Sequence, residues 1–321
     1  MSDMPTKVDI QEEGPREGFQ IEPGPISTER KIELIDTLSE TGLKKIQVAS
    51  FVNPKRVPGW ADADDVIRGF KAKEGVVYHA LWLNEKGIER AMQHSDRLTH
   101  MGSISTTASE TFMKHNTNRG FQINREVQRG QIQLYKKYGI KVRRASIMTA
   151  FGCNFEGEIA PQLVVDRLKE ILDIADEEGT PIEILSIADT MGWAAPNSIK
   201  QVVGKVRETW PDKRVCLHLH DTRGMGVANV YAGMEMGVDL FDSSVAGLGG
   251  CPFAALKGAA GNVCTEDIVF LCNEHGIETG VNLDALIEVA RLAEDIVGHP
   301  LPGSIMHAGS LTQYKVSQAA E

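Results

Sequence analysis

Two histidines, His218 and His220, lie two residues apart in the stretch VCLHLHDTRG, residues 215–224. The stretch alternates as a β-strand does, and residues two apart on a strand point to the same side. Imidazole nitrogens placed in this way can bind one divalent cation. The same pattern also fits two core histidines that are satisfied by hydrogen bonds, so the pair alone leaves both interpretations open.

Other polar side chains stand near the ends of predicted strands. A carboxylate such as Glu17 and a carbonyl oxygen such as that of Asn262 would complete a mostly oxygen ligand sphere, which suits Mg²⁺ or Mn²⁺. Arg16 lies in EGPREG, where it either pairs with a glutamate at the surface or holds a carbonyl or enolate oxygen. Asp189, at the end of another strand, offers a carboxyl group for proton transfer.

Cys251 lies in the glycine-rich stretch AGLGGCPFA, whereas structural cysteines are usually buried in strands or helices. This placement favours a chemical role for Cys251. The other cysteines look like packing residues, and no two form a CxxC pair, which indicates free thiols in a reducing compartment. The N-terminus has no apolar signal segment, and no apolar run approaches the roughly 20 residues that span a membrane. We therefore expect a cytoplasmic protein.

The elements that must position these residues alternate between short β-branched runs and longer amphipathic segments. The expected strands are residues 7–10, 45–52, 76–83, 97–105, 141–152, 182–189, 214–221 and 238–247. The expected helices are residues 27–42, 61–72, 84–95, 123–140, 160–179, 197–210, 226–237 and 281–298. Loops are expected after the first and fourth strands.

Eight such alternations without a long linker predict an α/β fold, a (β/α)8 TIM barrel with an extra C-terminal helical segment. An open doubly wound sheet is the alternative, but QEEGPREGFQ lacks the glycine-rich phosphate turn that usually follows its first strand. We expect a single domain over residues 1–321. The barrel would cover about 6–275, and the extension, about 276–321, would pack beside the barrel or over its mouth. The C-terminal ends of barrel strands form the active site, which is where the polar residues fall.

The net charge of −10 argues against nucleic acid or an anionic membrane surface as a partner, because both attract clusters of lysine and arginine. A local basic patch for a phosphorylated ligand remains open.

Several segments resemble 3-hydroxy-3-methylglutaryl-CoA lyases and, more widely, the metal-dependent TIM-barrel lyases and acyl-CoA Claisen-type synthases. They are EEGPREGFQ, SFVNPKRVP, ASETFMKHN, GCNFEGEIAP, ADTMGWAAP, HLHDTRGMGVANVYAGMEMGVDLFDSSVAGLGGCPFA and GNVCTEDIV. The resemblance runs from about residue 8 to about residue 295. It implies an acyl-CoA substrate and a homo-oligomer, a dimer or larger.

The resemblance also implies roles for individual residues. The metal ligands would be Glu17, His218, His220 and Asn262. Arg16 would stabilise an enolate, Asp189 would take part in acid–base chemistry, and Cys251 would protonate the enolate of acetyl-CoA. Glu266 matches a glutamate implicated in the site, and Gln47 and Ser244 would contact substrate together with Arg16.

Two positions depart from the family pattern. The family arginine is followed by Asp, whereas this chain has Glu17, which is one methylene longer. The second strand of the family carries Glu where this chain has Gln47. Because an amide is neither a base nor a counter-charge, we expect the site to carry one negative charge fewer. Both departures suggest a different acyl-CoA or 3-hydroxy acid substrate, or an altered activity.

The resulting hypothesis is retro-Claisen cleavage of a 3-hydroxyacyl-CoA similar to 3-hydroxy-3-methylglutaryl-CoA, giving acetyl-CoA and a 3-oxo acid. His218 or Asp189 would remove the proton of the 3-hydroxyl group, whose pKa the bound metal lowers. One alternative is a condensing enzyme of the same superfamily that joins acetyl-CoA to a 2-oxo acid. Another is a barrel that binds an acyl-CoA or a metal without turning it over.

Overall fold

The computed structural model describes residues 3–250, 261–312 and 314–315 of the 321-residue chain. Its main sheet contains eight parallel strands in the order β3-β2-β1-β10-β9-β8-β5-β4. These strands are β1 (Asp9–Glu12), β2 (Lys45–Phe51), β3 (Val77–Trp82), β4 (Gly102–Thr107), β5 (Val142–Met148), β8 (Ile184–Ala188), β9 (Arg214–His218) and β10 (Leu240–Ser243). The two ends of this order are connected by a 2.8 Å hydrogen bond from the Thr99 N–H group to the Tyr78 carbonyl oxygen.

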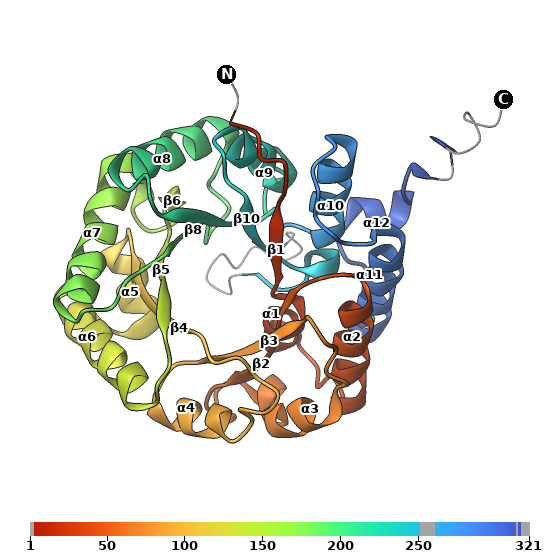
Figure 1. Cartoon of the computed structure of the whole chain (residues 1–321), viewed down its shortest axis with the longest axis horizontal. Helices are drawn as coiled ribbons and strands as arrows, with labels where there is room; N and C mark the ends of the chain where they lie inside the picture. Colours follow the sequence, from red (N-terminus) through yellow and green to blue (C-terminus); the bar gives the residue numbers. More distant parts are fainter. Residues whose placement is uncertain (1–2, 251–260, 313, 316–321) are drawn as a thin grey trace.

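Helices form a ring around the strands (Figure 1). They are α2 (Thr28–Glu40), α3 (Ala63–Gly69), α4 (Glu85–Met92), α6 (Phe121–Lys137), α7 (Pro161–Glu177), α8 (Pro196–Thr209), α9 (Gly226–Glu235) and α10 (Thr265–Glu274). One helix of this set follows each strand of the main sheet, which confirms the predicted (β/α)8 TIM barrel.

Helix α7 illustrates why these segments fold as they do. Pro161 occupies its first turn, where a missing N–H group costs nothing. Leu168, Ile171 and Leu172 recur at helical spacing and are buried in the core between helices and sheet. The chain turns out of the helix at Gly179, whose φ of 62° favours glycine.

Two segments that the sequence analysis expects as loops are helical. Residues after β1 form α1 (Gly14–Ile21), because Pro15 is compatible with a first helical turn. The polar stretch after β4 forms α5 (Glu110–Thr117), which Ser109 caps by accepting a 3.0 Å hydrogen bond from the Phe112 N–H group. The expectation of loops at these two places is therefore wrong: Pro15 suits the first turn of α1, and the Ser109 cap outweighs the polar composition of α5.

Other boundaries also differ from the expected ones. The fifth strand ends at Met148 because Thr149 adopts a φ of 55°, and a short hairpin of β6 (Gly152–Cys153) and β7 (Gly157–Glu158) follows. The eighth strand ends at Ser243 and continues into the 3-10 turn η2 (Val245–Gly247). A second 3-10 turn, η1 (Pro58–Trp60), lies between β2 and α3.

The C-terminal segment forms α11 (Leu283–Val297) and α12 (Ser304–Ala308), which confirms the predicted helical extension. Helix α11 packs against α2 and α10, so these helices lie beside the barrel (Figure 1). The exact domain boundaries remain a prediction. Among the described helices, none is long and apolar enough to cross a membrane.

The Glu12 carboxylate, which is fully buried at the end of β1, ties three segments together at the mouth of the barrel. It accepts hydrogen bonds from the Gly14 N–H group at 2.8 Å, the Val245 N–H group at 2.9 Å and the Thr265 hydroxyl group at 2.6 Å. One side chain therefore joins the start of α1, the turn after β10 and the start of α10.

We expect Glu12→Ala to lower the free energy of unfolding by about 3 kcal/mol or more, because it leaves three buried donors without an acceptor. Urea unfolding followed by circular dichroism measures the effect. Glu74→Ala is the matched control: Glu74 is exposed, and its loss should change the free energy by less than about 0.5 kcal/mol. Equal stability of the two variants would contradict this role for Glu12.

Candidate metal centre and active site

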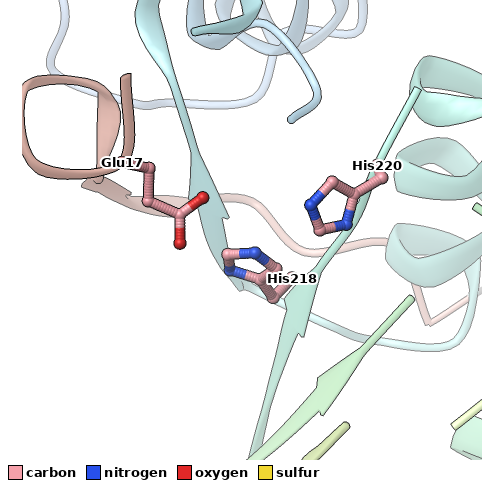
Figure 2. A group of neighbouring side chains, drawn as sticks. All are labelled: Glu17, His218 and His220. Carbon is pink, nitrogen blue, oxygen red and sulfur yellow. The ribbon is translucent and has the colours of Figure 1, made fainter. Parts of the chain in front are cut away.

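Three side chains from distant parts of the chain converge at the mouth of the barrel: Glu17, His218 and His220. One ligand atom from each lies within 4.8 Å of the other two, and in Figure 2 the three side chains point toward a common centre. Glu17 comes from the first turn of α1, His218 is the last residue of β9, and His220 follows that strand. The predicted convergence of the two histidines with Glu17 is therefore present in the structure.

A short bridge places Asn262 beside this group. His220 and Asn262 form an antiparallel β-bridge, and backbone hydrogen bonds of 2.8 and 3.0 Å flank it on either side. Residues 261–263 are thereby held along residues 219–221. A residue 42 positions away in the sequence is thus fixed next to the second histidine, a contact that helix and strand patterns do not reveal.

The hydrogen bonds of the two histidines leave the same nitrogen free on each ring. His218 Nδ1 lies 3.2 Å from a carboxylate oxygen of Asp242, and His220 Nδ1 donates to the carbonyl oxygen of Asp189 at 2.9 Å. When the rings are neutral, each Nε2 atom is then unprotonated and available as a ligand. A carboxylate or carbonyl group behind a metal-binding histidine commonly fixes the tautomer in this way.

The amide of Asn262 provides the test of whether a cation fits. Its Nδ2 atom donates to Glu17 Oε2, to Ser244 Oγ at 2.9 Å and to the Leu248 carbonyl oxygen at 3.1 Å, which fixes the orientation of the amide. Its Oδ1 atom is buried and has no partner among the described residues. Gly249 lets the chain pass close by, because a Cβ atom there would lie 2.6 Å from Glu17 Cβ. An orphaned carbonyl oxygen beside one carboxylate and two imidazoles fits a divalent cation.

Arg16 controls the charge of Glu17. Its Nη2 atom lies 2.8 Å from Glu17 Oε1, and the Trp60 indole N–H group donates to its backbone carbonyl oxygen at 3.0 Å. Burial alone would raise the pKa of Glu17, but the Arg16 guanidinium, the two histidines and the Asn262 hydrogen bond together outweigh it and lower the pKa to about 2. Glu17 is therefore an ionised oxygen donor at any ordinary pH.

The two histidines differ in their affinity for protons. Burial lowers the pKa of His220 to about 4, helped by the nearby charge of His218. Burial also opposes protonation of His218, but the hydrogen bond to Asp242 and the charge of Glu17 outweigh it and raise its pKa. Asp242 is in turn held by Arg144, an ion pair that the sequence analysis missed because Arg144 gives no motif signal on β5.

Asp189 lies directly after β8, next to the histidine strand. Its Oδ1 atom accepts from the Trp193 N–H group at 2.7 Å and the Ala194 N–H group at 3.1 Å, while Oδ2 is buried without a partner among the described residues. Burial raises the pKa of Asp189 to about 6. A carboxyl group with one free oxygen and a pKa near neutrality can accept and return a proton.

Glu13 supplies a carboxyl group that the sequence analysis overlooked. Its Oε2 atom lies 3.0 Å from Arg16 Nη2, and its side chain is 4% exposed. Gln47 accepts a hydrogen bond from Arg16 Nε, as a neutral neighbour. Glu13 therefore brings a second carboxyl group to Arg16 from the end of β1, although burial raises its pKa. The expectation of one negative charge fewer than in the family stays a prediction.

The remaining candidate residues lie at varying distances from this centre. Ser244 contacts the Asn262 amide, as described above. Glu266, at the start of α10, accepts from the Ala246 N–H group at 3.0 Å and is buried, and its contacts support the turn after β10 instead of the metal group. Burial raises the pKa of Glu266 to about 8. Cys251 lies outside the described residues. The four other cysteines are buried free thiols, as predicted.

Residues 7–293 match the family model described as HMGL-like. The chain belongs to the HMGL-like family. It is 38% identical over 306 residues to the hydroxymethylglutaryl-CoA lyase of Bacillus subtilis, which covers 93% of this chain and 96% of that protein. It is 36% identical over 295 residues to a Pseudomonas aeruginosa lyase named for 3-hydroxy-3-isohexenylglutaryl-CoA and hydroxymethylglutaryl-CoA, covering 92% of this chain and 94% of that one.

Solved structures of HMGL-like proteins share the fold. The B. subtilis HMG-CoA lyase superposes with a TM-score of 0.86 at 35% identity, covering 95% of this chain and 98% of that one. An HMG-CoA lyase from Acinetobacter baumannii, solved in complex with coenzyme A and 3-methylmalate, superposes with a TM-score of 0.84 at 35% identity, covering 96% of each chain. The family resemblance expected from the sequence is confirmed.

We expect His220→Ala to weaken Mn²⁺ binding by more than Asp242→Asn, which should cost roughly 10–100-fold because Asp242 only orients His218. Isothermal titration calorimetry of the metal-free protein with MnCl2 measures both. His115→Ala removes an exposed histidine and is the control. Unchanged affinity in His220→Ala would rule out the group formed by Glu17, His218, His220 and Asn262 as the metal site.

Proposed function

We propose that this protein is a divalent-metal-dependent carbon–carbon lyase. It cleaves a 3-hydroxyacyl-CoA similar to 3-hydroxy-3-methylglutaryl-CoA into acetyl-CoA and a 3-oxo acid. The observation that carries the proposal is the group of Glu17, His218 and His220 at the barrel mouth, with an orphaned Asn262 oxygen beside it. Membership of the HMGL-like family supports the same reaction.

Mg²⁺ or Mn²⁺ is the proposed cofactor, held by Glu17, His218, His220 and Asn262. When bound, such a cation lowers the pKa of a coordinated hydroxyl group and neutralises a neighbouring carboxylate. Two oxygens and two nitrogens from the chain leave coordination positions for substrate oxygens.

Asp189 is the better of the two candidate bases. Nδ1 of His218 is committed to Asp242, and its Nε2 atom belongs to the metal-binding group, so His218 has no free nitrogen for proton transfer. Oδ2 of Asp189 has no partner and its carboxyl group has a pKa of about 6, so it accepts the 3-hydroxyl proton near neutral pH. The electron pair of the C2–C3 bond then moves into the thioester to form an enolate.

Arg16 is the proposed partner of the enolate oxygen. Its Nε and Nη2 atoms are fixed by Gln47, Glu13 and Glu17, whereas Nη1 has no partner among the described residues. A guanidinium group held on one edge presents the other edge at a defined position, without reorganisation during the reaction. Cys251 is the proposed donor of the proton that C2 receives, a role that still rests on the resemblance.

An acyl-CoA partner and a homo-oligomer, a dimer or larger, belong to the same proposal. A reducing compartment such as the cytoplasm is proposed because the described cysteines are all free and buried. The condensing reaction with a 2-oxo acid uses similar groups, and simple acyl-CoA binding needs none of the free catalytic atoms. The unpaired Asp189 oxygen and Arg16 Nη1 favour a reaction over simple binding.

Incubation of the Mn²⁺-loaded protein with 3-hydroxy-3-alkylglutaryl-CoA thioesters should release acetyl-CoA, measured by liquid chromatography. Asp189→Asn should lower kcat by roughly 100-fold or more, because general base catalysis contributes 10²–10⁴-fold. His218→Ala and Cys251→Ala should lose most activity. If the metal is bound but no thioester releases acetyl-CoA, the lyase is excluded. If the protein releases free CoA when it is given acetyl-CoA and a 2-oxo acid, it is the condensing enzyme.

A further test moves the carboxyl group beside Arg16 from residue 13 to residue 47. Glu13→Gln should lower kcat/KM by roughly 10–100-fold, the scale of a small misplacement of a catalytic group. The double variant Glu13→Gln and Gln47→Glu should recover most of the loss, because residue 47 touches the same guanidinium. If the double variant is no more active than Glu13→Gln, Glu13 does not act through Arg16.

A further inference from the structure

A chain of hydrogen bonds runs from Arg16 through Gln47 to His79 and ends at a donor without a partner among the described residues. Arginine is always protonated, so Gln47 Oε1 must be the acceptor of the Arg16 Nε–H group. The Gln47 Nε2 atom then donates to His79 Nδ1, 3.3 Å away. With Nδ1 as an acceptor, the proton of a neutral His79 lies on Nε2.

His79 Nε2 is buried without a partner among the described residues, and the whole side chain is 4% exposed. Burial holds its pKa well below the ordinary value, so the ring is neutral and Nε2 is a donor. Buried polar groups in folded proteins are nearly always hydrogen-bonded, so an unpaired N–H group in a wall that pairs its neighbours points to a missing acceptor.

Strand register places His79 at the active-site end of the barrel. Tyr78 is paired with Ile46, Ile46 with Glu12, and Glu12 with Ser243. The next row of the barrel therefore contains His79, Gln47, Glu13 and Ser244. Because Ser244 contacts the Asn262 amide, this row connects His79, through Gln47 and Glu13, to the candidate metal centre.

Lys45 adds a positive charge next to His79. It lies two residues before Gln47 on β2 and so shares its inward-facing side. Its ammonium group makes no hydrogen bond or ion pair with any described residue. After burial, the charge of Lys45 does most to lower the pKa of His79, and burial followed by the charge of Arg144 lowers the pKa of Lys45 itself.

We propose that His79 Nε2–H and the Lys45 ammonium group form a subsite for a carboxylate on the 3-substituent of the acyl-CoA. The proposal rests on the lyase function and names its substrate class: 3-hydroxyglutaryl-CoA thioesters whose 3-substituent ends in a carboxylate instead of a methyl group. A neutral donor beside an unpaired cation recognises an anionic acceptor, whereas a methyl group would leave both donors unpaired.

The subsite is tested by binding, with thioesters that cannot be cleaved because they lack the 3-hydroxyl group. Dissociation constants of 3-(carboxymethyl)glutaryl-CoA and 3-methylglutaryl-CoA are measured by calorimetry on the Mg²⁺-loaded protein. We expect the carboxymethyl compound to bind at least about tenfold tighter, because the methyl compound lacks the carboxylate and leaves buried polar groups unpaired. His79→Met and Lys45→Met should each reduce this preference to within about threefold.

Two further variants separate recognition from folding. His79→Gln retains an N–H donor close to the Nε2 position and should keep the preference. His94→Met removes another buried histidine, one bonded to Asp64 at 2.9 Å, and should leave the preference unchanged. A wild-type preference near one, or a preference that survives both His79→Met and Lys45→Met, overturns the subsite.

Cleavage of the matching 3-hydroxy thioesters is assayed separately, so the two proposals fail in different ways. Cleavage without a binding preference keeps the lyase and overturns the subsite. A binding preference without cleavage of either thioester keeps the subsite and overturns the lyase.

Discussion

The ion pair between Arg16 and Glu17 is the interaction on which the other groups at the barrel mouth depend. A buried carboxylate tends to take up a proton, and a protonated Glu17 would be a poor ligand for a cation. Arg16 prevents this, but a buried guanidinium needs more than one acceptor of its own. Glu13 and Gln47 meet that need, so the arrangement of the wall follows from keeping one ligand ionised.

A second series of charged side chains keeps another group of the centre in its required state. His218 is oriented by Asp242, and Asp242 is ionised because Arg144 holds it. Breaking either series leaves an uncompensated charge inside the barrel, which costs more than the pair itself contributes. Strand pairing fixes part of this second series, since Asp242 on β10 is held in register with His218 on β9.

The sequence predicts the barrel and the common side of His218 and His220 because both depend on local periodicity. Alternation of strands and helices gives the fold, and spacing by two gives His218 and His220 a common side. The helix at Arg16 is hidden from the sequence pattern, because Glu13 at its N-cap makes no side-chain cap hydrogen bond and Gly14 and Pro15 are typical of loops. Glu13, Arg144 and His79 were missed for another reason. Their partners lie on other strands, and no short motif records a contact across a barrel.

Gln47, one of the two departures from the family pattern, links Arg16 to His79. A glutamate there would accept the Arg16 hydrogen bond, but it would also accept a hydrogen bond from His79 Nδ1–H and so favour the opposite tautomer of the ring. The Nε2 atom would then be an acceptor and could no longer donate to a ligand. With Gln47 the second carboxyl group at Arg16 comes from Glu13, and the amide sets His79 as a donor toward the barrel interior. A single change of oxygen to nitrogen at residue 47 therefore alters the polarity of the wall at β3, three strands away from β10, while Arg16 keeps its contacts with Glu13 and Glu17.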